Sequence, residues 1–199
     1  MSEQIQTSTI TELHHACITQ WKASGVSSQH NGFYRLVEEN HAFNYQLWHA
    51  EDRARRDDMG PEFVYQAKRE IDQCNQARNN RMEAMDTWLF NLLQPAAHDQ
   101  CPVNSESPGM MIDRLSILAL KSYHMALQTK RQDVAEEHRR TCYDKLTVIQ
   151  QQLEQLAFCL DTFVNEILAK KRTFRVYHQF KMYNDPTLNP ELYAPAVKL

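Results

Sequence analysis

The sequence has 199 residues, enough for one domain with a sizeable core, and its 4 glycines leave little material for a turn-rich β architecture. Its formal net charge is -3, from 22 basic and 25 acidic residues, so it lacks the general attraction for nucleic acid that a strongly basic domain has. No apolar run approaches about 18 residues, and no basic segment followed by an apolar run opens the chain. We therefore expect no nucleic-acid partner, no membrane span and no signal peptide.

Apolar residues at helical spacing predict the first two helices. Thr9 with Glu12 three residues later is a capping-box pattern, after which apolar residues recur at steps of three and four. We expect a first helix over residues 9–24, preceded by an N-terminal extension over residues 1–8. A second helix is expected over residues 32–57.

The third predicted helix is very long. Pro61 stands at a first helical position, where its missing N–H costs nothing, and an apolar pattern with steps of three and four follows. A helix over residues 61–93 would extend about 50 Å, at about 1.5 Å per residue. Arg78 and Arg81 interrupt its apolar seam halfway along.

Two more helices follow an irregular stretch that ends at Pro108. The helix over residues 108–128 is apolar nearly all round, which is typical of a central helix. The next helix carries apolar residues on a seven-residue rhythm that begins with Ala135 and Cys142, and it approaches about 40 residues before the pattern stops at Arg172. Its seam could bind a second copy of the chain or another protein, or it could pack inside one chain.

These elements predict an all-α fold, with one domain over residues 1–199. The expected architecture is a bundle of about five helices, two of them very long, with residues 173–199 as an extended C-terminal tail folded over the bundle. The five cysteines form no C-x-x-C pair, and four lie at or beside apolar helical positions, so we expect reduced thiols and a cytoplasmic protein without a structural zinc site. No motif assigns a cofactor.

The second helix places chemically useful residues on one face. His49, Asp52 and Arg56 stand at i, i+3 and i+7. His49 and Asp52 could pair a catalytic base with its orienting carboxylate, or ligate a metal. The alternative is a charged outer face joined by ion pairs from Glu51 to Arg55 and from Asp52 to Arg56.

A polar stripe runs along the third helix for about four turns. Asn and Asp are poor helix formers in mid-helix, so their use suggests a ligand groove, a buried network or a solvated face. The carboxylate spacing Glu83-x-x-Asp86 also allows a divalent metal. The stripe consists of Asp72, Asn75, Asn79, Glu83 and Asp86, with Arg69 and Arg78 among the residues at its edges.

The apolar fourth helix still carries charged residues. At 100° per residue, Asp113 and His124 lie within about 20° of each other, and so do Arg114 and Lys121 on the flank. Buried charge is costly unless it is paired or contacts a ligand. These residues could form a salt-bridge network with the acids of the third helix. They could instead form an anion pocket, in which Arg114 and Lys121 bind a phosphate while His124 and Asp113 handle a proton.

Four blocks of the sequence resemble a bacterial family known only as a domain of unknown function, number 4254. They read YQLWHAEDRARRDDM, KREIDQCNQARNNRMEAMD, ESPGMMIDRLSILALKSYHM and FRVYHQFKMYNDPTLNPELY. The likeness covers about residues 40–193, and DRLSILALK is its most specific part. It implies an all-helical protein of unknown activity, often encoded near lipopolysaccharide glycosyltransferases.

The resemblance also implies a set of signature residues, without catalytic roles. Ala50 and Ser107 depart from the expected pattern, in which we would see an acid and a threonine. The signature falls on His49, Asp52, Arg55, Arg56, Arg69, Asp72, Asn75, Arg78, Asn79, Asp113, Arg114, Lys121, Lys181, Tyr183, Asn184 and Asp185.

Three functions remain open at this stage. The first is binding of an anionic ligand, a phosphorylated sugar or nucleotide sugar, in a groove between the second, third and fourth helices, closed by the tail. Its cations would be Arg56, Arg78, Arg114 and Lys121. The second is a metal-dependent or histidine-based transferase or hydrolase, with His49 or His124 as base. The third is an accessory partner of a glycosyltransferase, or a homodimer.

Overall fold

The computed structural model describes residues 5–180, 182 and 185–193, and within them the predicted all-α fold is confirmed. The long helices are α1 (Thr7–Ser24), α2 (Gly32–Arg53), α3 (Pro61–Leu93), α4 (Pro108–Thr129) and α5 (Glu136–Leu168). Two short elements are the 3-10 helix η1 (Asp57–Met59) and α6 (Pro190–Tyr193). Among these described residues, no helix combines the length and the apolarity that crossing a lipid bilayer requires.

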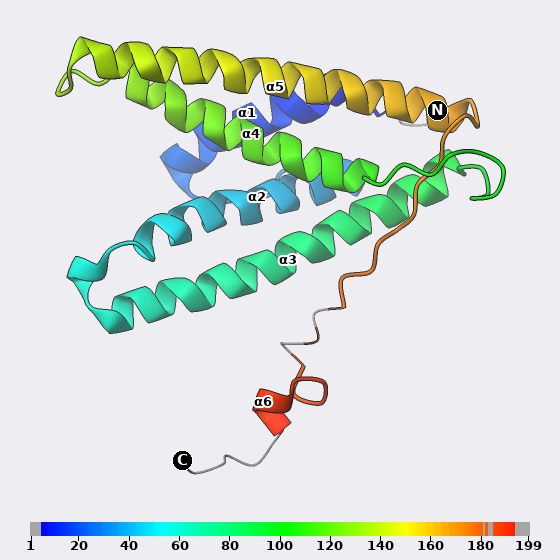
Figure 1. Ribbon diagram of the computed structural model, residues 1–199, viewed down its shortest axis with the longest axis horizontal. Coiled ribbons are helices and arrows are strands. Elements are labelled where there is room, and N and C mark those ends of the chain that lie inside the picture. Colours follow the sequence, from blue (N-terminus) through cyan, green and yellow to red (C-terminus); the bar gives the residue numbers. More distant parts are fainter. Residues whose placement is uncertain (1–4, 181, 183–184, 194–199) are drawn as a thin grey trace.

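The long helices form two hairpins with α1 packed behind them. Figure 1 shows α2 beside α3 and α4 beside α5, each pair running in opposite directions. The central helix is α4, which contacts α1, α2, α3 and α5. This position explains its composition, because a helix with neighbours on most sides must be apolar on most sides.

One large apolar core joins all five long helices. Phe33 of α2, Ile112 and Leu115 of α4 and Leu160 of α5 are among its most deeply buried members, at 0 to 1% exposure. The C-terminal half of the apolar seam predicted on α5, from Leu156 to Ile167, lies in this core, where α5 packs against α4 and α1. This half of the seam is therefore covered within one chain.

Several predicted helix ends differ from the structure, and α5 has 33 residues where about 40 were expected. The first helix begins at Thr7 after Gln6, which makes no side-chain cap, so the capping box at Thr9 is wrong. The second helix ends at Arg53, four residues earlier than predicted. Arg56 consequently leaves the helical face that carries His49 and Asp52, and its guanidinium pairs with Asp58 instead.

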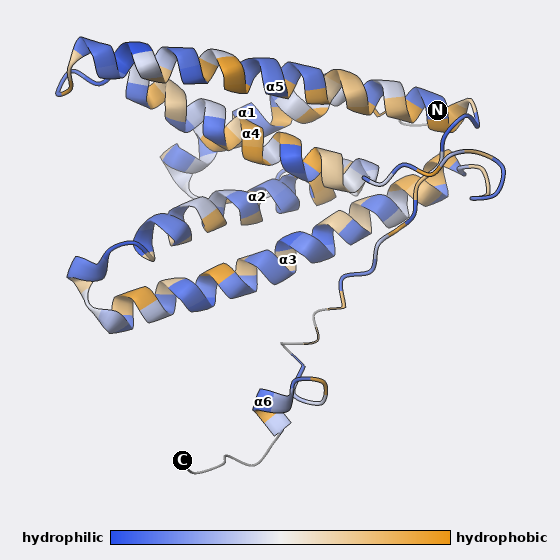
Figure 2. Ribbon diagram, in the orientation of Figure 1, coloured by the Kyte–Doolittle hydropathy of each residue, from blue (hydrophilic) through white to orange (hydrophobic). Residues whose placement is uncertain are grey.

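The helix α3 contributes both apolar and polar surface. It begins at Pro61 after Gly60, whose φ of 87° lies in the left-handed region that favours glycine. Figure 2 shows its middle turns as hydrophilic and its C-terminal end as largely apolar. The apolar end packs into the core through Met85 and Leu89, so the hydrophilic middle is the part left to form a site.

After α5 the chain turns back across α3. Residues 173–180 lie against the bundle, where Thr173 bridges to Val103 and His178 contacts Glu83. Figure 1 shows α6 further along the tail, apart from the long helices.

Candidate functional site

A buried carboxylate ties the three helices α2, α3 and α4 together. Asp113 of α4 is 2% exposed, and its Oδ1 atom accepts hydrogen bonds from Asn40 Nδ2 at 3.0 Å, Asn44 Nδ2 at 2.9 Å and Arg78 Nε at 2.7 Å. Its Oδ2 atom accepts from Arg78 Nη2 at 2.5 Å. The buried charge is thus paired and fully hydrogen-bonded, the condition under which burying a carboxylate is tolerable.

The network continues to two histidines at the α1 side. Asn44 Nδ2 donates to Ser116 Oγ at 2.9 Å, and His41 Nδ1 lies 2.7 Å from the same oxygen. His41 Nε2 lies 3.0 Å from the carbonyl oxygen of His14, which can only accept, so Nε2 carries the proton and Nδ1 accepts from Ser116. This imidazole is neutral. Burial lowers the pKa of His41 to about 3, although the hydrogen bond to the His14 carbonyl raises it.

The local sequence explains why these side chains meet. Asn40 and Asn44 lie one helical turn apart on α2, between the buried apolar residues Val37 and Leu47. They are polar positions inside an apolar seam. Sequence reasoning missed Asn40, His41 and Asn44, and this interruption of the Val37–Leu47 seam is the signal that could have found them.

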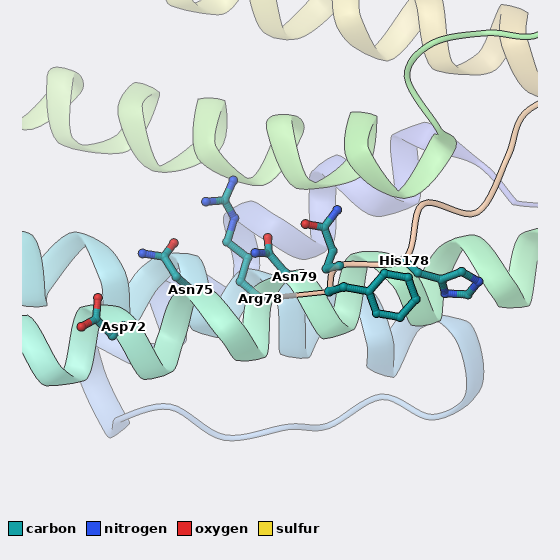
Figure 3. Close-up of a pocket in the computed structure, with 7 residues that line it drawn as sticks. Asp72, Asn75, Arg78, Asn79 and His178 are labelled. Atoms are coloured by element: carbon teal, nitrogen blue, oxygen red, sulfur yellow. The ribbon is translucent and has the colours of Figure 1, made fainter. Parts of the chain in front are cut away.

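Arg78 stands where two cavities adjoin. The first, of about 750 Å³, lies between α3 and the tail (Figure 3), and the second, of about 360 Å³, lies between α2, α3 and α4. Both are lined by Asn75 and Arg78, and we refer to them together as the Arg78 groove. The lining of the first is Asp72, Asn75, Arg78, Asn79, His178, Gln179 and Phe180. The lining of the second is Asn44, Leu47, Trp48, Glu51, Asp52, Arg55, Asn75, Arg78, Ile117 and Leu120.

The charges of the Arg78 groove are largely balanced. Arg78 is neutralised by Asp113, whose hydrogen bonds raise the pKa of the guanidinium. Asp72 accepts a hydrogen bond from Lys68 at 2.9 Å, and Arg55 donates to Glu51 at 2.7 Å. The remaining polar surface is rich in side-chain amides, which both donate and accept hydrogen bonds. Such a surface suits a ligand with many hydroxyl groups better than a bare anion.

Several predicted site residues come together here. Asp52, Asp72, Asn75, Arg78 and Asn79 all line the Arg78 groove, and Asp113 supports it from behind. Arg69 lies at the edge of the Arg78 groove, where its Nη1 atom is 3.8 Å from Asp72 Oδ2 and its side chain is mostly exposed.

The structure does not bring the four predicted cations into one pocket. Arg114 and Lys121 line a separate cavity of about 610 Å³ between α4 and α5, where Arg114 donates to Glu106 at 2.7 Å. Arg56 pairs with Asp58 outside both cavities. The physical reason is that Asp113 and Arg114, as neighbours on one helix, point about 100° apart.

The predicted pairing of Asp113 with His124 does not form. Eleven residues of α4 separate them, about 16 Å along the axis, and Asp113 is bound to Arg78. The ring of His124 instead stacks on Trp48, with centroids 4.4 Å apart, and lies edge-on to His49 at 6.1 Å. Burial lowers the pKa of both imidazoles, with nearby Asp52 acting in the opposite direction.

The carboxylates proposed for a metal also have separate partners. Glu83 contacts His178 in the tail. Asp86 accepts from Ser107 Oγ at 2.5 Å and from the backbone N–H of Gly109 at 2.7 Å, and burial raises its pKa to about 6. In the part of the chain that the structure describes, no three His, Cys, Asp or Glu side chains converge as metal ligands would.

The tail positions are only partly described. Lys181, Tyr183 and Asn184 lie outside the described residues. The Asp185 carboxylate accepts from the backbone N–H of Thr187 at 2.8 Å and from its hydroxyl at 2.7 Å. Asp185 therefore forms a turn, the local role that Asx residues before proline commonly have.

A family model described as "Protein of unknown function (DUF4254)" matches residues 34–176. The chain therefore belongs to this family, and the match includes every residue of the Asp113 network on α2, α3 and α4. Residues 178–180, which complete the groove from the tail, lie beyond the matched region. Searches of curated proteins and of solved structures found no match.

Proposed function

We propose that this member of a family of unknown function binds a phosphorylated sugar or nucleotide sugar in the Arg78 groove. It acts as a binding protein in surface-polysaccharide assembly. The chemistry of the groove supports the ligand class. The place in polysaccharide assembly, and a glycosyltransferase as partner, rest on the family resemblance alone.

The observation that carries the proposal is how Asp113 holds Arg78. Asp113 occupies the Nε–Nη2 edge of the planar guanidinium, which leaves the Nη1–Nη2 edge for a second acceptor. A phosphate oxygen pair fits that edge, because an arginine can bind two oxygens in parallel. The side chain is already ordered by its buried partner, so binding a phosphate costs less conformational entropy.

The rest of the groove suits the sugar. Asn75 and Asn79 line it from α3, and Gln179 lines it from the tail. Each amide can donate to one hydroxyl and accept from another, the pairing that adjacent sugar hydroxyls require. Trp48 adds apolar surface from α2, against which the carbon face of a sugar or a base can pack.

The enzymatic alternative has less support in the structure. The Nε2 atom of His124 is buried and has no hydrogen-bond partner among the described residues, and its ring is stacked on Trp48. Neither His49 nor His124 lines the Arg78 groove. We therefore assign the groove a binding role.

A thermal-shift panel tests the proposal. The purified chain would be scanned with nucleoside diphosphate sugars, hexose 1-phosphates, free hexoses, free nucleotides and inorganic phosphate. We expect the phosphorylated sugars to raise the Tm most, since a ligand at 100 times its Kd stabilises the folded state by about 2.7 kcal/mol. The Asn79→Ala variant should lose the shift and Arg114→Ala, on the other face of α4, should keep it. A panel without any shift would contradict the proposal.

A further inference from the structure

The tail is firmly attached at one point before it reaches the groove. Thr173 donates its hydroxyl to the carbonyl of Ala96 at 2.8 Å and its backbone N–H to the carbonyl of Pro102 at 3.0 Å. The next residue, Phe174, is fully buried between Phe90 and Phe163. The chain at residues 173–174 is therefore part of the core and cannot move without disturbing it.

Beyond this anchor, the Glu83 carboxylate contacts the described part of the tail at two consecutive residues. The His178 Nδ1 atom lies 2.5 Å from Glu83 Oε1, and the backbone N–H of Gln179 donates to Glu83 Oε2 at 3.2 Å. The hydrogen bond from His178 lowers the pKa of Glu83, so the carboxylate is ionised at neutral pH. The pair is exposed to solvent, and exposed pairs of this kind are weak.

The held segment forms one wall of the Arg78 groove. Figure 3 shows His178 further along α3 than Asn79, and His178 lines the same cavity as Arg78 and Asn79. Phe180, the last residue of this wall, is 83% exposed, so core packing does not fix it. A firm anchor, a weak contact and an unburied end are the features of a segment that can swing away locally.

We propose that residues 175–180, here named the strap, are a gate over the Arg78 groove that Glu83 holds shut. Ligand enters when His178 and Gln179 leave Glu83, and the strap returns over it through Gln179 and Phe180. The gate controls access to the site of the proposed function, and its biological role rests on that function. Its opening and closing do not require a ligand, so it can be tested without one.

The test compares Glu83→Ala with a matched control, Glu62→Ala, which removes a carboxylate from the exposed first turn of the same helix. Alanine is a good helix former, so both variants should fold. Hydrogen exchange followed by mass spectrometry reports on the strap. In Glu83→Ala the peptide that contains Gln179 should exchange faster, because the Gln179 amide loses its acceptor, while Thr173 and α3 keep their protection. The control should match the parent chain throughout.

A second readout measures access to the groove. The thiol of an Asn79→Cys variant would be labelled with a maleimide, and its peptide separated by mass spectrometry from those of the native cysteines. Adding Glu83→Ala should raise the labelling rate about twofold to fivefold, the change expected from losing one exposed ion pair. Adding Glu62→Ala should leave the rate unchanged.

Two results would overturn the gate. Unchanged exchange of the peptide that contains Gln179 in Glu83→Ala would show that Glu83 does not hold the strap. Faster exchange without faster labelling would show that the strap does not cover the groove. A flat ligand panel alongside a positive gate result would count against the proposed function and leave the gate standing.

Discussion

Arg78 and Asp113 are 35 residues apart in the sequence, yet they meet through two hydrogen bonds, from Nε to Oδ1 at 2.7 Å and from Nη2 to Oδ2 at 2.5 Å. The contact joins α3 to α4 and at the same time orients the arginine toward the groove. The pair therefore contributes to stability directly, and in the proposed function it contributes to binding by orienting Arg78.

Removing Asp113 should destabilise the fold strongly. In Asp113→Ala, Arg78 loses its buried partner, and the amides of Asn40 and Asn44 lose an acceptor. We expect a loss of about 3 to 5 kcal/mol in the free energy of unfolding, measured by urea denaturation. The control Arg114→Ala removes an exposed pair with Glu106 and should cost less than about 1 kcal/mol. Equal losses in the two variants would contradict the assigned role of Asp113.

The buried imidazoles should make the fold sensitive to acid. Burial lowers the pKa of His41 to about 3 and lowers that of His14 well below its usual value. Below about pH 6.5 the unfolded chain binds protons that the folded chain excludes, so stability is complete above that pH and declines as the pH falls toward 3. His41 alone predicts a loss of about 2 kcal/mol between pH 6.5 and 5. The free energy of unfolding, measured by denaturation at several pH values in this range, should depend less on pH in His41→Gln than in the wild type. A wild-type stability independent of pH would contradict the prediction.

Gly109 should tolerate no side chain. A Cβ atom there would lie 2.7 Å from Asp86 Oδ1 and 2.7 Å from the backbone carbonyl of Met82. The backbone of α3 cannot shift without disturbing its own hydrogen bonds. The hydrogen bond from the Gly109 N–H to Asp86 Oδ1 also fixes the start of α4. Gly109→Ala should lower the free energy of unfolding by about 1 to 3 kcal/mol. The exposed-face change Thr87→Ala, on the neighbouring turn of α3, provides the control, and equal stability in the two variants would argue against close packing at Gly109.

The elements that the sequence predicted well are those with local causes. Pro61 and Pro108 stand at the starts of α3 and α4. The periodic apolar residues that follow each proline predict a helix without information about its neighbours. The capping box at Thr9 failed because α1 begins one half-turn earlier, where Thr7 donates its hydroxyl to Asp161 of α5 at 2.5 Å. That partner lies 154 residues away, which local pattern cannot reveal.

The site was predicted in part for the same reason. Periodicity placed Asp72, Asn75 and Arg78 on one side of α3, and the structure places them along one groove. Periodicity could not determine which face of α4 turns toward α3. Arg114 was therefore grouped with Arg78, although Arg114 faces α5. Asn40 was overlooked although it interrupts the apolar seam of α2 together with Asn44, because the sequence does not show that Asp113 is their shared partner.

Binding calorimetry of the ligand that gives the largest thermal shift, repeated with Asn75→Ala and Arg114→Ala, tests whether the Arg78 groove is the binding site. Asn75 lines both cavities of the groove, whereas Arg114 lies in the α4–α5 cavity. We predict that Asn75→Ala weakens binding about 10-fold, as the loss of hydrogen bonds to a ligand should, and that Arg114→Ala leaves the Kd within about twofold. Tight binding that survives Asn75→Ala and is lost in Arg114→Ala would place the ligand on the other face of α4 and contradict the account.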